Sequence, residues 1–404
     1  MISLKMDVLQ YRIMQMSKLV FLLNTSLNKN GPSTHLLMDI IFEAKKSGFD
    51  VNIISPDQRS EIGIGGFVVK NFYVQIENTN KNNFIKRLIV EFKFAHKATR
   101  IALQLNADAV FVQSTTIPKE YIKPLKKHKI KVLLNVQDIF PQNLHFSEQL
   151  PLDFLTYHFF LNEQKKALKI VDRVVTVSDD MAETLAGNGL DRQKIAVVYN
   201  WSYSDTPIGN GGVDRDEQCI IKRNDNCFNV LYAGNIGKMQ NVEELLLAAE
   251  LLGTDNIIFH ILGDGANKNK IMKRFSNLKN VIYYPFVDQQ YAEKIYSQAD
   301  LNVIPLKPKG IFTAMPSKTA TCFRTRRPVL FCIDENSISA KIFKELGGVY
   351  VTKPNYKTIA NKITEISKKT GNQYDSRDSF FLMYMSKKSN PRKYISAIES
   401  MLNT

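Results

Sequence analysis

The sequence predicts an α/β protein made of two doubly wound, Rossmann-like domains, and three observations lead to this fold class. Short apolar runs alternate with segments of helical period along most of the chain, as expected for parallel strands joined by crossover helices. The length of 404 residues exceeds what one compact core usually holds. A stretch rich in Gly, Asn, Asp and Ser, residues 201–228, separates two such alternating halves.

From this separation we expect a first domain at residues 1–200, a linker at 201–228 and a second domain at 229–387. Apolar residues recur at helical spacing near the end of the chain, so a C-terminal helix at about 388–404 is expected to cross back to the first domain. The first 15 residues lack the apolar core and cleavage site of a signal peptide.

The predicted elements follow from apolar runs bounded by Gly, Pro, Asn and Asp, and from helical spacing between them. In the first half, strands are expected at Lys18–Asn24, Val51–Ser55, Ala107–Gln113, Lys131–Val136, Arg173–Ser178 and Ile195–Tyr199, with helices at Leu36–Ser47 and Phe84–Leu105. In the second half, strands are expected from Val230 and at Asn256–Leu262, Val281–Tyr284, Leu301–Ile304 and Val329–Ile333, with helices at Val242–Leu252, near Tyr291–Gln298 and from Pro316.

The net charge of +15 implies an anionic partner, which phosphates, an anionic membrane face or nucleic acid would each satisfy. Residues 81–131 carry 12 Lys and Arg against 3 acids, with Phe and Ile interleaved. This pattern suits a helix lying on anionic lipid, and it equally suits a core-packing helix with a basic outer face. No recognised module supports nucleic acid as the partner.

The cysteines and the lengths of the apolar runs indicate which kind of protein, and which cellular compartment, to expect. The four cysteines form no CxxC pair and no His cluster accompanies them, so neither a metal site nor a disulfide framework is expected. No apolar run reaches the roughly 18 residues that a membrane-spanning helix needs. We therefore expect a reduced, cytoplasmic protein.

The stretch Gly310–Asp334 reads as a loop, a helix that Pro-Ser-Lys opens, a basic turn and a buried strand. Pro316 suits the first helical position, which would leave the N–H groups of Ser317, Lys318 and Thr319 pointing out of the helix. The Lys318 side chain adds a full positive charge. The segment therefore predicts a phosphate site, with an ordinary helix start on a basic face as the alternative.

Two Gly-rich turns follow predicted strands of the second domain. Gly234 and Gly237 stand on the first, and Gly263 and Gly265 on the second, where the lack of a side chain allows backbone to approach a phosphate closely. Together with residues 316–318, these turns place three strand ends at one edge of the predicted sheet. We expect a ligand at this edge.

In the first domain, two features fall at carboxyl ends of predicted strands. A loop with Gly31, Pro32 and Ser33 follows the first strand, where open α/β sheets bind ligands. Asp138 follows the strand Lys131–Val136, a position suited to ligand contact or base chemistry. The alternative for Asp138 is a cap on the next helix.

Several segments together resemble the GT-B retaining glycosyltransferases of family 4, across most of residues 18–370. The likeness is greatest to the bacterial branch that builds capsule, O-antigen and exopolysaccharide repeat units, including N-acetylfucosamine transferases. The segments that carry it are YAGNIGKMQN (232–241), HILGDG (260–265), QADLNVIPL (298–306), MPSK (315–318), RRPVL (326–330), VQDIFPQNL (136–144) and DRVVTVSDDM (172–181).

The resemblance implies two domains facing a cleft, with a UDP-sugar on the second and a lipid-diphosphate-linked saccharide on the first. Backbone amides and cations would stabilise the departing diphosphate, so neither a metal nor another cofactor is expected. The donor-binding residues implied are Gly234, Asn235, Gly237, Lys238, Gly263, Asp264, Gly265, Phe286, Val287, Pro316, Ser317, Lys318 and Thr321. The acceptor-binding residues implied are Gly31, Pro32, Ser33 and Asp138, with Asp138 and Lys318 as catalytic residues.

The sequence also departs from the family pattern. Many family-4 enzymes carry a Glu-x7-Glu pair, and the corresponding residues here are Thr313 and Thr321. Arg324 and Arg326 replace residues that are usually small. Three functions follow as hypotheses: a transferase on the cytoplasmic face of the cell membrane, a non-catalytic partner of another transferase, or a UDP-sugar 2-epimerase on the same fold.

Overall fold

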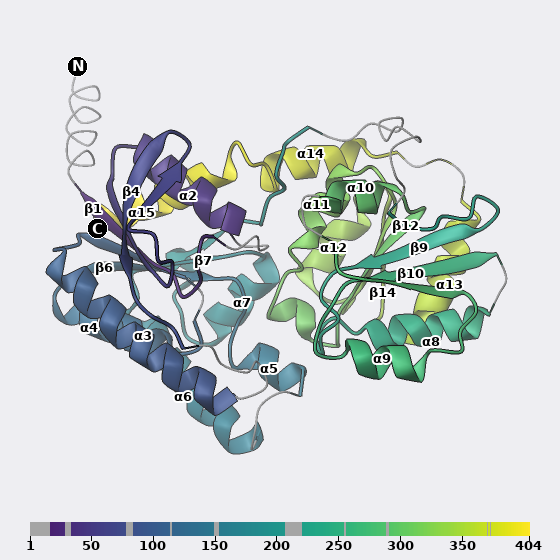
Figure 1. Ribbon diagram of the computed structural model, residues 1–404, viewed down its shortest axis with the longest axis horizontal. Coiled ribbons are helices and arrows are strands. Elements are labelled where there is room, and N and C mark those ends of the chain that lie inside the picture. Colours follow the sequence, from purple (N-terminus) through teal and green to yellow (C-terminus); the bar gives the residue numbers. More distant parts are fainter. Residues whose placement is uncertain are drawn as a thin grey trace. The chain divides into compact units, whose positions relative to one another are not determined.

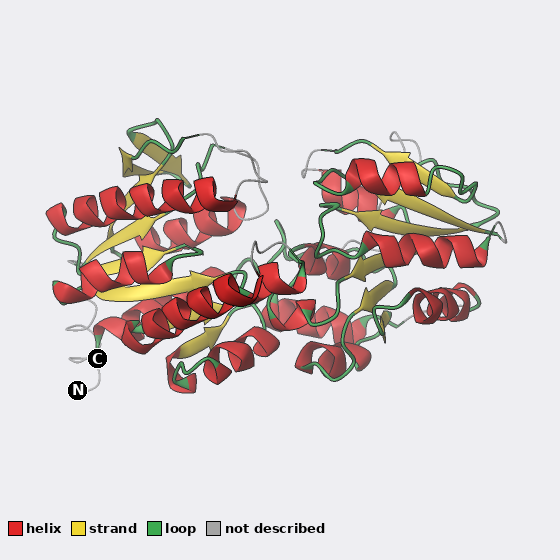
Figure 2. Cartoon of the chain, turned by 90° about the horizontal axis from the view of Figure 1, so that it is seen from below, coloured by secondary structure: helices red, strands yellow, loops and turns green. Residues whose placement is uncertain are grey.

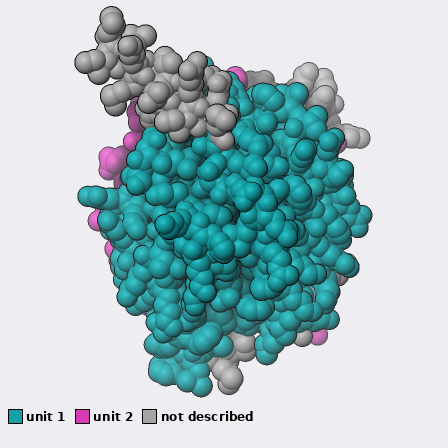
Figure 3. Space-filling model, turned by 90° about the vertical axis from the view of Figure 1, so that its left-hand side faces the viewer, with its two compact units in different colours: residues 1–145, 149–199, 388–404 teal, residues 146–148, 200–387 magenta. Residues whose placement is uncertain are grey.

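The computed structural model describes residues 17–28, 34–77, 84–113, 115–148, 153–206, 220–253, 256–287, 291–369, 371 and 373–404. The chain forms two compact units, which Figure 3 colours separately. Unit 1 comprises residues 1–145, 149–199 and 388–404, and unit 2 comprises residues 146–148 and 200–387. Of the linker expected at 201–228, residues 207–219 lie outside the described part.

Unit 1 contains, within its described residues, an eight-stranded sheet in the order β3-β4-β2-β1-β5-β6-β7-β8. Neighbouring strands run parallel, except that β3 and β4 form an antiparallel pair at the edge. Most inner strands are buried along nearly their whole length, because helices cover both faces of the sheet. The strands are β1 Lys18–Leu22, β2 Asp50–Ser55, β3 Glu61–Ile64, β4 Phe67–Tyr73, β5 Ala109–Val112, β6 Lys131–Val136, β7 Arg173–Thr176 and β8 Ile195–Val197.

The helices of unit 1 form two layers (Figure 1). Helices α3, α4 and α6 pack in series on one face, and α2 and α15 pack together on the other. The C-terminal helix α15 also contacts β6 and β7, which confirms that it returns to the first half of the chain. The helices are α2 Thr34–Lys46, α3 Phe84–Gln104, α4 Pro118–Lys127, α5 Gln142–Phe146, α6 Asp153–Ile170, α7 Asp179–Gly187 and α15 Asn390–Leu402.

Unit 2 has, in its described part, a six-stranded sheet in the order β11-β10-β9-β12-β13-β14, with every pair parallel. All six carboxyl ends therefore reach the same edge. The sequence predicted five of these strands and missed β14. The strands are β9 Phe228–Ala233, β10 Ile257–Leu262, β11 Val281–Tyr284, β12 Leu301–Pro305, β13 Val329–Cys332 and β14 Val349–Thr352.

Helices flank this second sheet as well (Figure 2). Helices α8 and α13 pack on each other over one face, while α11 contacts both α10 and α14. The helices are α8 Val242–Leu252, α9 Lys268–Arg274, α10 Ala292–Ser297, α11 Lys318–Arg324, α12 Ile338–Lys344, α13 Tyr356–Ser367 and α14 Asp375–Tyr384. None of the helices in the described ranges of the chain has the length and apolar character needed to cross a bilayer.

A buried polar network ties three strands of unit 2 together around His260. Its Nδ1 lies 2.9 Å from the hydroxyl of Tyr284, and its Nε2 lies 3.0 Å from Oδ1 of Asn229. The amide nitrogen of Asn229 donates to Asp300, so its Oδ1 is left to accept from Nε2–H of a neutral imidazole. Burial is the main reason that the pKa of His260 falls to about 4.

Candidate functional site

The two Gly-rich turns of unit 2 touch each other at the carboxyl edge of the sheet. The amide N–H of Gly234 donates to the carbonyl oxygen of Leu262 at 2.9 Å. A Cβ on Gly263 would overlap the carbonyl oxygen of Gly234, and Gly263 has a φ of +145°. Only glycine fits at position 263, so the sequence pattern reflects this close approach of two backbones.

The side chain of Asn235 fills the space between the two turns. A Cβ on Gly265 would lie 2.6 Å from Oδ1 of Asn235, and a Cβ on Gly237 would lie 2.9 Å from its Nδ2. The amide N–H of Ile236 donates to the carbonyl oxygen of Asp264 at 2.7 Å. The structure thus brings the predicted residues 234–237 and 263–265 into one contiguous surface.

Lys318 reaches this surface from the third strand end. Its Nζ donates to the carbonyl oxygen of Ala233 at 2.8 Å and lies 4.0 Å from the ring centre of Tyr232. A Cβ on Gly234 would lie 2.9 Å from the same nitrogen. Burial lowers the pKa of Lys318 to about 8, because desolvation disfavours its charged form. The ammonium therefore lies on the first Gly-rich turn.

The helix that follows starts later than the sequence predicted. Helix α11 begins at Lys318, with Ser317 before it and Pro316 two residues upstream. The N–H of Thr319 donates to the carbonyl oxygen of Pro316 at 3.1 Å, so the expectation of a free N–H at Thr319 is wrong. Since α11 has only seven residues, the positive charge at this edge comes chiefly from the Lys318 side chain.

The remaining predicted donor residues lie around the same sheet edge. Phe286 follows β11 by two residues and is 68% exposed, with Val287 half-buried beside it. The carboxylate of Asp264 lies 4.0 Å from Nζ of Lys268. Lys238 donates from its Nζ to the carbonyl oxygen of Glu148 at 3.1 Å. These positions agree with one common edge, because the strands that precede them are parallel.

The two threonines at the Glu-x7-Glu positions differ in burial and in hydrogen bonding. Thr313 is fully buried, and its hydroxyl donates to the carbonyl oxygen of Gly310 at 3.0 Å. Thr321 is half-buried on α11, one helical turn after Lys318. Thr321 can therefore contribute to the ligand surface that Lys318 shares, whereas the Thr313 hydroxyl is already used internally.

Two tyrosines support the site, and the sequence analysis did not identify either. Tyr232 lies under the Lys318 ammonium, and its hydroxyl donates to the carbonyl oxygen of Asn235. The hydroxyl of Tyr296, from α10, donates to the carbonyl oxygen of Ala233 at 3.0 Å. The available signal for Tyr232 was an aromatic residue two positions before Gly234, but nothing local marked Tyr296.

The basic turn after α11 is held by ion pairs, which accounts for the arginines that replace small residues there. Arg324 pairs with Glu293 on α10, and its Nε donates to the carbonyl oxygen of Thr206. Arg326, at a φ of +49°, donates from Nε to Asp378 on α14 at 2.8 Å. The arginines anchor α11 to its neighbours, so the positive charge of this turn is largely neutralised.

Asp138 lies at the carboxyl edge of the sheet in unit 1, two residues after β6, and its side chain is exposed. Desolvation raises the pKa of its carboxyl group above the ordinary value. It is not the N-cap of α5, which begins at Gln142. The loop residues Gly31, Pro32 and Ser33 lie outside the described residues.

An amide network holds the end of β6, three residues before Asp138. Oδ1 of Asn135 accepts from the Tyr394 hydroxyl at 3.1 Å and from Nε2 of Gln137 at 3.2 Å. The Asn135 amide nitrogen donates to Oε1 of Gln113 at 2.9 Å. Tyr394 belongs to α15, so the C-terminal helix helps to fix the end of β6 from which Asp138 extends.

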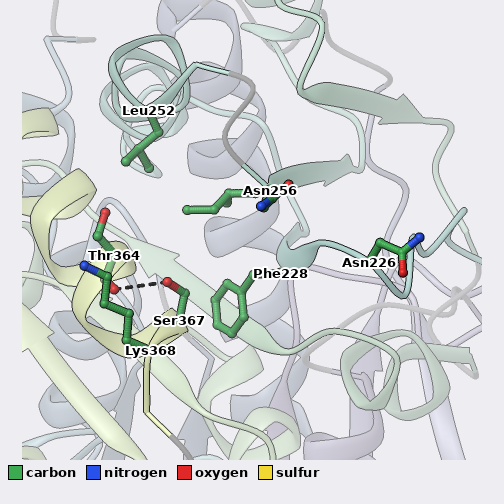
Figure 4. Close-up of a pocket in the computed structure, with 8 residues that line it drawn as sticks. Asn226, Phe228, Leu252, Asn256, Thr364, Ser367 and Lys368 are labelled. Carbon is green, nitrogen blue, oxygen red and sulfur yellow. Dashed lines mark hydrogen bonds between the residues drawn. The ribbon is translucent and has the colours of Figure 1, made fainter.

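A pocket of about 440 Å³ lies elsewhere in unit 2 (Figure 4). Phe228 and Ile257, which begin β9 and β10, line it together with the last turns of α8 and α13. It therefore sits at the amino edge of the sheet, opposite the Gly-rich turns. Among the described residues, no group of three or more His, Cys, Asp or Glu side chains gathers as metal ligands.

Each half of the chain matches the model of a known protein family. Residues 31–201 match the model of Glycosyltransferase Family 4, and residues 215–378 match that of Glycosyl transferases group 1. The chain is 23% identical over 289 residues to the probable glycosyltransferase WbjE of Pseudomonas aeruginosa, covering 69% of this chain and 70% of that protein. It is 26% identical over 199 residues to the putative colanic acid biosynthesis glycosyl transferase WcaI of Escherichia coli K12, covering 47% and 46%.

Solved structures show the same fold. The crystal structure of Anabaena Alr3699/HepE in complex with UDP and glucose superposes with a TM-score of 0.65 at 12% identity, covering 95% of this chain and all of that one. These matches confirm the expected GT-B fold. The first half of the chain therefore resembles Glycosyltransferase Family 4, the second half resembles Glycosyl transferases group 1, and together the two halves have the GT-B fold.

Proposed function

We propose that this chain transfers a sugar from a UDP-sugar to a lipid-diphosphate-linked saccharide in the synthesis of a cell-surface polysaccharide, with retention of anomeric configuration. One observation carries the donor half of the proposal. The ammonium of Lys318 lies on the first Gly-rich turn, 2.8 Å from the carbonyl oxygen of Ala233, beside backbone that only glycine allows to come so close. A diphosphate is the ligand whose charge and size suit such an edge.

The proposed roles follow from this placement. Gly234, Asn235 and Gly237 approach the diphosphate, and Lys318 neutralises it with Ser317 alongside. The turn Gly263–Gly265 lines the rest of the donor site. Thr321, on the same helix as Lys318, supplies a hydroxyl toward the sugar.

Other residues are proposed to bind the uracil and to orient the acceptor hydroxyl. Phe286 and Val287 flank the uracil. The departing phosphate helps to deprotonate the acceptor hydroxyl, and Asp138 is the residue proposed to orient that hydroxyl. Amides and an ammonium stabilise the leaving group, so we propose a reaction that chelators leave unaffected.

Support for a nucleotide-sugar donor comes from the relatives. Anabaena Alr3699/HepE, which shares the fold, was crystallised with UDP, with UDP and glucose, and with UDP-glucose. Support for a polysaccharide product comes from WcaI, which is described as a putative colanic acid biosynthesis glycosyl transferase. The basic segment 81–131 is the proposed contact with an anionic membrane on the cytoplasmic side, where the lipid-linked acceptor is held.

The direct test mixes the purified protein with radiolabelled UDP-sugars and lipid-linked acceptor, with and without EDTA. Label should move to the lipid fraction for at least one donor, at the same rate in both buffers. Absence of transfer with every donor rejects the proposal. A dependence of the rate on added metal rejects its mechanism.

A second candidate is a non-catalytic partner subunit of another transferase. Thr313 favours this function. It stands where many family-4 enzymes have the first Glu of the Glu-x7-Glu pair, but it is fully buried and its hydroxyl donates to the carbonyl oxygen of Gly310. No acidic side chain therefore faces a ligand from this position. Calorimetry separates the two functions. Binding of UDP supports the transferase, whereas absence of UDP binding with tight binding to a second transferase supports the partner subunit. Epimerised UDP-sugar in the absence of acceptor would instead identify an epimerase.

A further inference from the structure

An aromatic ring and a carbonyl oxygen hold the ammonium of Lys318. Its Nζ lies 4.0 Å from the ring centre of Tyr232 and donates to the carbonyl oxygen of Ala233 at 2.8 Å. No carboxylate among the described residues pairs with this ammonium. A carboxylate would neutralise the charge, whereas the face of an aromatic ring stabilises an ammonium and leaves its charge available to an anion.

Two tyrosine hydroxyls bind the carbonyl groups on either side of Gly234. The Tyr296 hydroxyl, on α10, donates to the carbonyl oxygen of Ala233 at 3.0 Å. The Tyr232 hydroxyl, on β9, donates to the carbonyl oxygen of Asn235. Tyr232 is fully buried and Tyr296 is 7% exposed, so bulk water cannot replace either bond without cost. The first Gly-rich turn therefore has two side-chain supports, from different elements.

The N–H groups of the same turn divide into two sets. Those of Gly234 and Ile236 donate to carbonyl oxygens at the end of β10 and in the turn that follows it. In the part of the chain that the structure describes, the N–H groups of Asn235 and Gly237 have no acceptor. Hydrogen-bond donors, namely these two N–H groups and the neighbouring ammonium, are thus available at this edge, and such a set is complementary to an anion.

We propose that Tyr232 and Tyr296 are positioning residues of the donor site, which fix the first Gly-rich turn and the Lys318 ammonium relative to each other before the diphosphate binds. The ring of Tyr232 holds the ammonium, and the two hydroxyls hold the carbonyl groups of the turn. The inference rests on the proposed function and deepens it, because it names residues that act through Lys318 and the turn. Preorganisation of this kind raises affinity, since fewer groups have to be ordered when the ligand binds.

The competing role for both tyrosines is support of the fold of unit 2 alone. Tyr283, on β11, provides the matched comparison, because its buried hydroxyl has no hydrogen-bond partner among the described residues. Removal of that hydroxyl changes a tyrosine of the same sheet without changing a bond to the Gly-rich turn.

Lys318 is the group of this cluster that titrates near pH 8. The other titratable groups around the ammonium are Tyr232 on β9, Tyr296 on α10 and Cys322 on α11. Burial raises the pKa of all three, that of Cys322 to about 12, so each is neutral near pH 8. Burial lowers the pKa of Lys318 to about 8. A measured pKa of Lys318 therefore reports how well the ring holds its ammonium.

Competitive acetylation measures that pKa in the ligand-free chain, independently of any reaction. Trace acetic anhydride is applied over a series of pH values, and the peptide that contains Lys318 is quantified by mass spectrometry. Tyr232→Phe keeps the ring and should leave the pKa as in the native chain. Tyr232→Leu removes the ring but keeps the surroundings apolar, and should lower the pKa by roughly one pH unit. Equal pKa values in the native chain and Tyr232→Leu overturn the role of the ring.

Calorimetry with UDP tests the two hydroxyls. Tyr232→Phe and Tyr296→Phe each remove one bond to the turn and should weaken UDP binding about fivefold to tenfold. Tyr283→Phe should bind UDP as the native chain does. Urea unfolding of the three variants shows that each is folded under the conditions of the measurement. Equal losses of affinity in all three variants would assign the tyrosines to the fold alone.

A double-mutant cycle shows whether the ring acts through Lys318. In the native background, Tyr232→Leu should bind UDP about fivefold more weakly than Tyr232→Phe at pH 7.5. In the Lys318→Ala background, the same two substitutions should give equal affinities, because the ring has no ammonium to hold. A fivefold difference in both backgrounds contradicts the positioning role.

These outcomes separate the inference from the proposed function. A native chain without affinity for UDP rejects the proposed function, whereas the acetylation series still decides whether the Tyr232 ring holds the ammonium. UDP binding that is the same in the native chain, Tyr232→Phe and Tyr296→Phe rejects the positioning role of the hydroxyls and leaves the proposed function standing.

Discussion

The Nζ atom of Lys318 lies 2.8 Å from the carbonyl oxygen of Ala233, the last residue of β9. The contact joins the start of α11 to the turn that opens at Gly234. It leaves hydrogen-bonding capacity on the ammonium, which has three donors. The proposed donor site depends on this relationship.

Lys318→Ala should weaken UDP binding and sugar transfer about 100-fold. Loss of a charge-assisted contact to a phosphate in a desolvated site costs on the order of 3 kcal/mol. The matched control is Lys341→Ala, an exposed lysine on α12, which should behave as the native protein. Calorimetry with UDP and a transfer assay measure the two effects, and full activity of Lys318→Ala would show that the phosphate assignment is wrong.

The affinity for UDP should decrease as the pH rises above about 8. Burial lowers the pKa of Lys318 to about 8, so above that pH the free protein holds a neutral amine, while a bound diphosphate favours the ammonium. Binding must then take up a proton, and the affinity falls with each further rise in pH. Calorimetry at several pH values in two buffers measures this uptake, and a pH-independent affinity would contradict the assignment; Lys318→Ala should show no uptake.

Gly263→Ala should destabilise unit 2 by roughly 3 kcal/mol or more, because an added Cβ overlaps the carbonyl oxygen of Gly234 and forces one turn to move. Gly187→Ala is the comparison, since a Cβ there meets open space and the residue lies in α7. That substitution should be neutral or stabilising by up to about 1 kcal/mol. Urea unfolding of both variants measures the difference; similar midpoints would argue against the close approach of the two turns.

The contribution of His260 to the free energy of unfolding should decrease as the pH falls. The pKa is about 4 in the folded chain and 6.5 in the reference state, so the unfolded chain binds more protons between these values. The contribution is present in full above pH 6.5 and is lost as the pH falls toward 4, with a total of about 3 kcal/mol.

His260→Gln removes the titrating group and is compared with the native chain by urea unfolding at pH 7.5, 6 and 5. At pH 7.5 the variant should be the less stable protein, because it disturbs the bonds to Asn229 and Tyr284. The gap between the two should narrow as the pH falls. A gap that stays constant would mean that His260 does not titrate as the structure implies.

The sequence was sufficient for the strand–helix order because each buried strand is a continuous apolar run. Lys131–Val136 and Val281–Tyr284 have the same limits in sequence and structure, and Val242–Leu252 is the same helix in both. The β3–β4 pair was missed because its residues alternate between buried and exposed at a sheet edge. Helix α11 was predicted two residues too early, because Pro316 suits a helix start without requiring one.

Some residues of the candidate site could be predicted from the sequence, and others could not. Glycines mark close backbone contacts, so Gly234, Gly237, Gly263 and Gly265 were identifiable from the sequence alone. Tyr296 was not, because its hydroxyl meets Ala233 across a distance of 63 residues and no local pattern reports such a contact. The same holds for Tyr394, which reaches Asn135 from the other end of the chain.

Local composition by itself determined the fold class, the Gly-rich turns and the basic character of residues 81–131, since each depends on neighbours along the chain. The tertiary structure alone decided that Lys318 folds back onto β9 and that Arg324 and Arg326, at the end of α11 and after it, are neutralised by ion pairs. These features depend on which distant segments pack against one another. Hydrophobic burial selects that packing over the whole chain, and no short stretch of sequence records it.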